Sequence, residues 1–212
     1  MPKIIKKDWD VALAVVIGLV LTVVGIIGLS SMVARPSSVT ADTATETVEV
    51  SATVAAWVSL EVTPTTTTLT PDLVTSAGGV NIGESDYIQI TTGTNNVTGY
   101  SLDIKSLNGA LCHSTGCATG TISSASTTLV AGIDGYGAQA NSSDGDVTIA
   151  TSFDHATSTN TVGGLIQTDD DLADTGSESS DDIIWLTLKA AATSTKTVGT
   201  YEDTITLTLT SL

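Results

Sequence analysis

Basic residues are scarce in this sequence. Its 212 residues include 7 Lys and Arg against 23 Asp and Glu, for a formal net charge of −16. After Arg35 the only basic residues are Lys105, Lys189 and Lys196. A nucleic-acid partner requires Lys and Arg to neutralise its phosphates, and anionic lipid headgroups repel an acidic surface. We therefore expect no nucleic-acid partner.

Cysteine and histidine are equally scarce, with two of each. Cys112 and Cys117 are so close in sequence that, outside the cytoplasm, a disulfide is the expected outcome. The alternative is a metal site using Cys112, His113 and Cys117, with His155 as the only other candidate ligand, although structural zinc usually takes four ligands. Only His113 and His155 could act as a general base, and no G-x-S-x-G motif accompanies Asp154-His155. We predict that the protein is not an enzyme.

Charged residues are absent from Val11 to Ala34, which is long and apolar enough to cross a bilayer as a helix. Lys3, Lys6 and Lys7 precede this run, so residues 1–10 are expected to stay in the cytoplasm and the rest to be exported. Two alternatives remain open: a cleaved signal peptide, and an uncleaved anchor that makes the membrane a partner through residues 11–34. A type IV pilin leader is a third, less well matched alternative, because Asp10 stands where a small residue is customary. Both main alternatives place the protein at the cell surface or outside the cell.

Helical periodicity is absent after Ala34, whereas Thr and Val, which favour extended backbone, are abundant. Residues 35–46 form a Ser/Thr/Pro-rich spacer, and residues 47–212 are predicted to form an antiparallel β-sandwich of the Ig-like or jelly-roll type. The strands are expected at residues 47–62, 86–91, 98–105, 127–133, 147–153, 183–189 and 201–209. Residues 86–91 and 98–105 are predicted to pair as a hairpin, and residues 169–182 to form an acidic loop.

The most regular alternation runs from Thr47 to Val62, where every second residue is apolar. A strand of this length either bends from one sheet to the other or projects and completes the sheet of a neighbouring subunit. In the second case the assembly strand comprises Val48, Val50, Ala52 and Val54, and Trp57 marks the bend or a subunit contact.

Two further kinds of site are predicted. The carboxylates Asp169, Asp170, Asp171, Asp174 and Glu178 offer the oxygen ligands that calcium prefers, and the alternative is a solvated acidic loop. No other cofactor is expected. Asn96-Val-Thr98 and Asn141-Ser-Ser143 are N-glycosylation sequons.

The stretch Gly199-Thr-Tyr-Glu-Asp-Thr-Ile-Thr-Leu-Thr-Leu209 resembles the last strand of secreted prokaryotic fibre and coat sandwiches. Spore coat U, fimbrial subunits and TasA-like or camelysin-like proteins share this style, and so does the Asn-rich turn of residues 95–104. The resemblance covers about 25 residues, implies a structural role at the cell surface and transfers no functional residue.

These observations favour a structural cell-surface protein, a subunit of a filament, pilus or coat that associates with itself or with other envelope proteins. The alternative is a membrane-anchored module that binds carbohydrate or protein, with Trp57, Trp185, Tyr87 or Tyr136 lining a sugar-stacking face.

Overall fold

The computed structural model describes residue 46 and residues 49–212. These residues form strands joined by turns, and no helix occurs among them. Residues 52–212 make up one compact unit. The prediction of an all-β fold with antiparallel sheets is confirmed. The cytoplasmic residues 1–10, the apolar run 11–34, spacer residues 35–45 and Val48 lie outside the described residues.

The largest sheet is seven-stranded and antiparallel. Its strand order is β1 (Val58–Thr63), β3 (Ile88–Thr94), β12 (Ser179–Ala191), β8 (Gly135–Ser142), β10 (Thr161–Gly164) and β7 (Thr127–Thr128), and β2 (Ile82–Glu84) also pairs with β12. β12 is 13 residues long and pairs along its length with β2, β3 and β8. It is therefore the central strand of the sheet.

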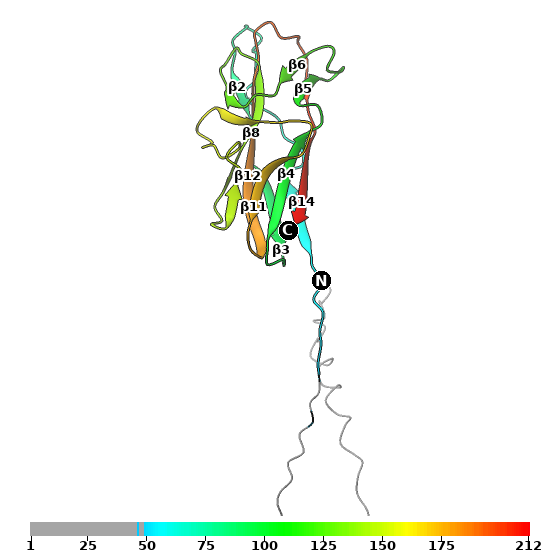
Figure 1. Cartoon of the computed structure of the whole chain (residues 1–212). Helices are drawn as coiled ribbons and strands as arrows, with labels where there is room; N and C mark the ends of the chain where they lie inside the picture. Colours follow the sequence, from blue (N-terminus) through cyan, green and yellow to red (C-terminus); the bar gives the residue numbers. More distant parts are fainter. Residues whose placement is uncertain (1–45, 47–48) are drawn as a thin grey trace, which may run out of the picture. The chain divides into compact units, whose positions relative to one another are not determined.

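Two smaller sheets complete the domain. A four-stranded sheet has the order β14 (Ile205–Ser211), β4 (Tyr100–Ser106), β11 (Asp170–Thr175) and β9 (Val147–Ile149). A three-stranded sheet has the order β13 (Tyr201–Glu202), β5 (Ala110–His113) and β6 (Thr121–Ser123). Figure 1 shows β4, β11 and β14 in front of β3 and β12, with β5 and β6 at the far end of the domain.

The core lies between the two larger sheets. Ile90, Ile184 and Leu186 from the seven-stranded sheet pack in one cluster with Leu102, Leu172 and other residues of the four-stranded sheet. Because both sheets bury one face against this cluster, the arrangement is sandwich-like. Burial follows the predicted alternation: Leu102 and Ile104 of β4 are buried, and Ile184 and Leu186 of β12 are buried while Trp185 faces outward.

The predicted hairpin between residues 86–91 and 98–105 is wrong. β3 pairs with β1 and β12, whereas β4 pairs with β11 and β14, so the turn between β3 and β4 crosses from one sheet to the other. Gly99 in this turn has a φ of +83°, and a Cβ there would overlap the backbone of Thr175. The turn therefore passes tightly against the end of β11, where only glycine fits.

The predicted acidic loop 169–182 is also wrong, because most of it is strand. β11 ends at Thr175 and β12 begins at Ser179, so only a short connection between the two sheets remains. The strands predicted at residues 127–133 and 147–153 are shorter than expected: only β7 (Thr127–Thr128) and β9 (Val147–Ile149) are present. In β11 the adjacent carboxylates Asp170 and Asp171 are followed by two adjacent buried residues, Leu172 and Ala173, with a shift in pairing register between Asp171 and Ala173. The stretch therefore lacks the regular alternation by which a strand is predicted from sequence.

β8 was not predicted. Its sequence, Gly-Tyr-Gly-Ala-Gln-Ala-Asn-Ser, has no large apolar alternation, yet its first six residues are buried. A Cβ at Gly137 would overlap the carbonyl of Gly163 and the side chain of Val162 on β10. The small residues of β8 thus permit the close approach of the neighbouring strand.

The long strand predicted over residues 47–62 is present only in its last third. β1 spans Val58–Thr63, and residues 49–57 belong to no strand. An alternating sequence forms a strand only where its backbone has a hydrogen-bonding partner. The pairing of β1 with β3 ends at Val58 and Thr94, so residues 49–57 have no partner strand.

Candidate functional site

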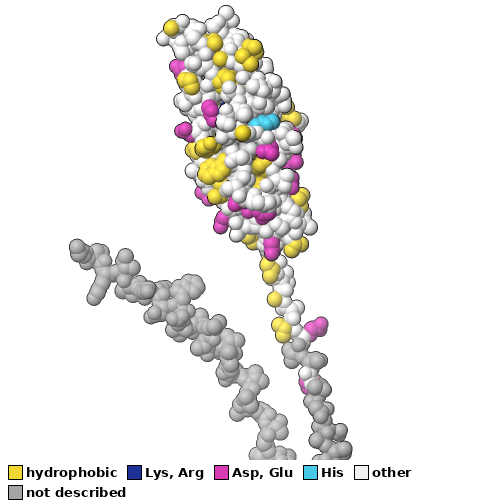
Figure 2. All heavy atoms as spheres, turned by 90° about the vertical axis from the view of Figure 1, so that its left-hand side faces the viewer, with side chains coloured by type: hydrophobic (Ala, Val, Ile, Leu, Met, Phe, Trp, Pro, Cys, Tyr) yellow, Lys and Arg dark blue, Asp and Glu magenta, His cyan; other side chains and the backbone are white. Residues whose placement is uncertain are grey.

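The first candidate site is the segment of residues 49–57, which we call the uncovered segment. Every residue in it is exposed. Val50 is 86% exposed, Val54 is 84% exposed and Trp57 is 46% exposed. Figure 2 shows apolar side chains of the residues before β1 standing free of the domain surface. An alternating apolar stripe with nothing packed against it is costly in water and indicates an interaction site.

The root of the uncovered segment is held by Asn95. The Asn95 carboxamide accepts a hydrogen bond from the Trp57 N–H and donates one to the Ala55 carbonyl, both at 2.9 Å. Thr94 Oγ1 donates to the Trp57 carbonyl at 3.1 Å. The Trp57 ring lies against Gly93, where a Cβ would come within 3.3 Å of it. Asn95 was not predicted as a functional residue, because its only signal in the sequence is its place in the turn after residue 94.

Two edge strands lie beside each other near this root. β1 and β14 contact one another, and each is the terminal strand of its sheet. On β14, Ile205, Leu207 and Leu209 are half-buried, while Thr206, Thr208 and Thr210 are exposed. This confirms the predicted faces of the C-terminal strand. The outer backbone edge of β14 has no partner strand among the described residues.

A second candidate site lies on the outer face of the seven-stranded sheet. Trp185 on β12 is flanked in register by Gln89 on β3 and Asn141 on β8. Tyr87 contacts Trp185 edge to face, with ring centroids 6.0 Å apart and an interplanar angle of 63°. Tyr87, Trp185 and Asn141 line a shallow depression of about 310 Å³. The other two aromatics proposed for a sugar-stacking face do not join it: Tyr136 is buried, and Trp57 packs against Gly93 instead.

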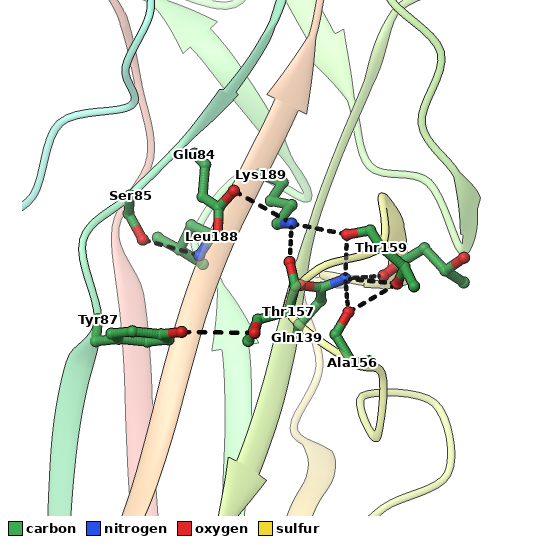
Figure 3. A network of polar contacts seen from close by, with 10 residues as sticks. Glu84, Ser85, Tyr87, Gln139, Ala156, Thr157, Thr159, Leu188 and Lys189 are labelled. Atoms are coloured by element: carbon green, nitrogen blue, oxygen red, sulfur yellow. Dashed lines mark hydrogen bonds and ion pairs between the residues drawn. The ribbon is translucent and has the colours of Figure 1, made fainter.

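The wall of this depression is supported by a buried lysine (Figure 3). Tyr87 Oη donates to Thr157 Oγ1 at 3.5 Å, and Lys189 Nζ donates to the carbonyls of Thr157 and Thr159, both at 2.7 Å. Lys189 is 1% exposed and forms an ion pair with Glu84 at 3.2 Å. The network was not predicted, because a single Lys inside a strand normally faces solvent.

Gln139 anchors the same loop from β8. Its Nε2 donates to the carbonyls of Thr159, at 3.0 Å, and of Thr161. Gln139 is completely buried under residues 154–161. Lys189 and Gln139 thereby fix the loop that carries Thr157, the hydrogen-bond partner of Tyr87.

All three lysines of the described part are used in ion pairs. Lys105 pairs with Asp169 at 3.0 Å, Lys189 with Glu84, and Lys196 with Asp134. On the face of the domain in Figure 2, carboxylates are scattered and no Lys or Arg side chain is visible. The positive charges of the domain are therefore neutralised locally.

The two cysteines lie at disulfide distance. The sulfur atoms of Cys112 and Cys117 are 1.93 Å apart, which agrees with the predicted pairing. His113 is buried beside them, with its Nδ1 2.8 Å from Thr115 Oγ1 and its ring edge-on to Tyr201. His113 is thus held by its neighbours at the end of the domain that carries β5 and β6.

The predicted calcium ligands are spread along β11 and the turn after it. Asp169 pairs with Lys105, Asp170 and Asp174 are half-buried, and Asp171 and Glu178 are exposed. Burial, followed by the nearby charges of Asp174, Asp103 and Asp170, raises the pKa of Asp171. Within residues 49–212 no group of three or more His, Cys, Asp or Glu has the geometry to hold a metal. Calcium binding stays a prediction.

The two sequons differ in their surroundings. Asn96 Nδ2 donates to Ser211 Oγ at 2.9 Å and to the Leu212 carbonyl, so its amide nitrogen is engaged. Asn141 lies in the aromatic depression beside Trp185. Glycosylation at either position stays a prediction.

Comparisons with protein-family models, with curated proteins and with solved structures found no match. In the described part of the chain, no helix has the length and apolarity required to cross a membrane.

Proposed function

We propose that the protein is a structural subunit at the cell surface, which assembles into a filament, pilus or coat by donating its uncovered segment to a neighbouring copy. The observation that carries this proposal is the exposure of Val50 and Val54, 86% and 84%, in a segment of alternating apolar residues. Burial of one Val side chain is worth about 1.5 kcal/mol, so burying the stripe in a second copy supplies a driving force.

The proposed acceptor is the free edge of β14. A donated strand gains main-chain hydrogen bonds from such an edge, and its side chains at alternate positions enter the space beside the core. The half-buried side chains of Ile205, Leu207 and Leu209 on β14 pack against the core cluster, so a strand added at this edge would extend the same apolar layer. The donated residues Val50, Ala52 and Val54 share one parity, so they face the core of the acceptor together.

Charge favours this pairing over other contacts. Residues 50–60 and residues 204–212 contain no charged residue, in a chain whose formal net charge is −16. Two copies that meet through these stretches avoid placing carboxylates opposite one another. Apart from Glu49 at its start, the donor segment is therefore as free of charge as the acceptor strand, which lowers the repulsion between two acidic copies.

Two further parts of the proposal concern location and fold type. The protein reaches the cell surface through residues 11–34, which act as a cleaved signal peptide or an anchor, and the disulfide distance of Cys112 and Cys117 suits an oxidising compartment. The sandwich-like arrangement is proposed to be of the Ig-like or jelly-roll type. Intact mass of protein sheared from cells, compared with the membrane fraction, separates the alternatives: a species starting near Arg35 or Asp42 means cleavage.

The assembly test is the double variant Val50→Asp/Val54→Asp in the full chain. We expect sedimentation and electron microscopy to show loss of polymers, while the melting temperature of the monomer stays unchanged, because these side chains contact nothing in the monomer. The matched control is Val198→Asp, since Val198 is 94% exposed and lies outside the proposed contact. Polymers that persist in the double variant would contradict the donor role.

The acceptor is tested separately by cross-linking. Thr53→Cys is combined with Thr206→Cys or with Thr208→Cys, which are exposed positions on β14. Side chains on paired strands lie about 5 Å apart, so an intermolecular disulfide is expected in polymers with one of the two combinations. Polymers that form without either cross-link would mean that another edge accepts the segment.

A further inference from the structure

The residues that line the aromatic depression, Tyr87, Trp185 and Asn141, are not members of the hydrophobic core. Three of the seven aromatic residues in the described part are buried in the core: Tyr100, Tyr136 and Phe153 are at most 1% exposed. Tyr87, by contrast, is 54% exposed and stands against a half-exposed Trp185 on the outer face of the seven-stranded sheet. With an aromatic content of only 4%, two exposed rings in contact indicate a binding surface.

The walls of the depression adjoin a buried polar network. Tyr87 Oη makes only a long contact of 3.5 Å to Thr157 Oγ1, but the loop that carries Thr157 is fixed by Lys189, which donates to the carbonyls of Thr157 and Thr159 and pairs with Glu84 (Figure 3). Trp185 projects from β12, which is paired on both sides. Pre-organised walls lower the entropic cost of binding.

The chemistry of the lining selects the ligand. Rings of Trp and Tyr offer apolar faces with polar edges, which match the C–H faces of a pyranose ring. The side-chain amides of Asn141 and Gln89, on either side of Trp185 in register, provide donors and acceptors for hydroxyl groups. The single nearby cation, Lys189, is buried and already paired, so an anionic ligand finds no counter-charge.

We propose that Tyr87, Trp185 and Asn141 form a binding site for one pyranose ring of a neutral saccharide. The volume of about 310 Å³ is at the small end for ligand sites, which suits a single ring rather than an extended chain. The ring stacks on Trp185, with Tyr87 as the side wall and Asn141 as the hydrogen-bonding group. This site is independent of the assembly proposed above.

The test uses the full chain and three probes: methyl β-glucoside, N-acetylglucosamine and methyl β-glucuronide. Binding is followed by nuclear magnetic resonance at the indole N–H of Trp185. We expect a saturable shift with one or both neutral probes and about tenfold weaker binding of the anionic glucuronide. No shift with either neutral probe up to its solubility limit overturns the proposal.

Two tryptophan variants locate the site. Trp185→Ala should weaken binding at least about tenfold, as expected for loss of a stacking partner. Trp57→Ala is the matched control, because Trp57 is also a partly exposed tryptophan but lies at the root of the uncovered segment, and it should leave saccharide binding unchanged. Equal effects of the two variants overturn the site. If Trp185→Ala does not fold, Tyr87→Ala, at an exposed position, takes its place.

The same ring contact can come from a free saccharide or from a glycan linked to Asn141 of the chain itself. Intact mass of protein from its native source, with and without Asn141→Gln, separates the two. A hexose-type addition lost in Asn141→Gln, together with a Trp185 signal that differs from that of unmodified protein, supports the site with its own glycan as occupant. A glycan at Asn141 that leaves the Trp185 signal unchanged overturns the stacking.

Discussion

The Thr92 hydroxyl donates a hydrogen bond to the phenolic oxygen of Tyr100 at 2.7 Å. Thr92 belongs to β3 and Tyr100 to β4, so this contact joins the two larger sheets through the core. Tyr100 in turn donates to Asp182 Oδ2 at 3.1 Å. Burial, with the nearby Asp182 carboxylate, raises the pKa of Tyr100 above its usual range, so the phenol keeps its proton and its role as a donor.

Tyr100→Phe should therefore destabilise the domain. The substitution leaves the buried Thr92 hydroxyl and the buried Asp182 carboxylate without their partner, which typically costs about 1–3 kcal/mol. Urea unfolding followed by circular dichroism measures the loss. Tyr87→Phe is the matched control, because the Tyr87 hydroxyl is exposed and its contact to Thr157 is long. Equal losses in the two variants would contradict the stabilising role of the inter-sheet contact.

Lys189→Met should loosen the loop of residues 154–161. The carbonyls of Thr157 and Thr159 lose their donor and Glu84 loses its ion pair, so we expect a loss of about 1–3 kcal/mol. Amide hydrogen exchange should speed up in this loop. Lys105→Met serves for comparison, because its ion pair with Asp169 is exposed to solvent and should be worth less than about 1 kcal/mol. Unchanged exchange at residues 154–161 would argue against the anchoring role.

Asp171→Asn should stabilise the protein near neutral pH. The pKa of the Asp171 carboxyl is raised in the folded state, so the folded protein binds the carboxyl proton more tightly than the unfolded chain does. The free energy of unfolding therefore falls as the pH rises and Asp171 loses this proton. Asn cannot ionise, so the gain should be present at about pH 7 and vanish at about pH 3. Melting temperatures at both pH values test this, with Asp72→Asn, at an exposed loop position, as the control. Added salt should reduce the rise in melting temperature, because it screens the repulsion between Asp171 and the neighbouring carboxylates.

Removal of the disulfide should have a modest effect. The loop between Cys112 and Cys117 is short, and the chain-entropy estimate for closing so short a loop is about 2 kcal/mol. The double variant Cys112→Ser/Cys117→Ser should therefore fold and melt at a lower temperature than the parent protein. Addition of a reductant should lower the melting temperature of the parent but leave that of the double variant unchanged. Complete unfolding of the variant would mean that the pair contributes more than loop closure.

The strands that the sequence predicted well are those with large alternating side chains. Tyr100, Leu102 and Ile104 mark β4, and Ile184, Leu186 and Leu188 mark β12, because each has one buried face. β8 escaped prediction because, apart from Tyr136, its buried positions are occupied by Gly, Ala and Gln, which give no alternation of large apolar side chains. Strand pairing could not be predicted, because the sequence of residues 92–99 is compatible both with a hairpin and with a turn that crosses between sheets.

The candidate sites were predicted in part. The apolar stripe of residues 50–54 was predicted from its alternation with polar residues. Tyr87 and Trp185 were predicted as aromatic residues at polar positions of their strands. Their supports were not, since Asn95 and Lys189 act through partners that are 30 to 40 residues away in the chain. Long-range hydrogen bonds of this kind leave no periodic signal in the sequence.

The local pairing of every lysine in the domain has a consequence for encounters between copies. With Lys105, Lys189 and Lys196 already bound to carboxylates, an approaching copy meets a surface of like sign and has no free cation to steer toward. The screening length falls from about 10 Å at 0.1 M salt to about 3 Å at 1 M. Ionic strength should therefore control the rate of the proposed polymerisation. We expect added salt to speed nucleation, and dilution into low-salt buffer to keep the subunits apart without unfolding them.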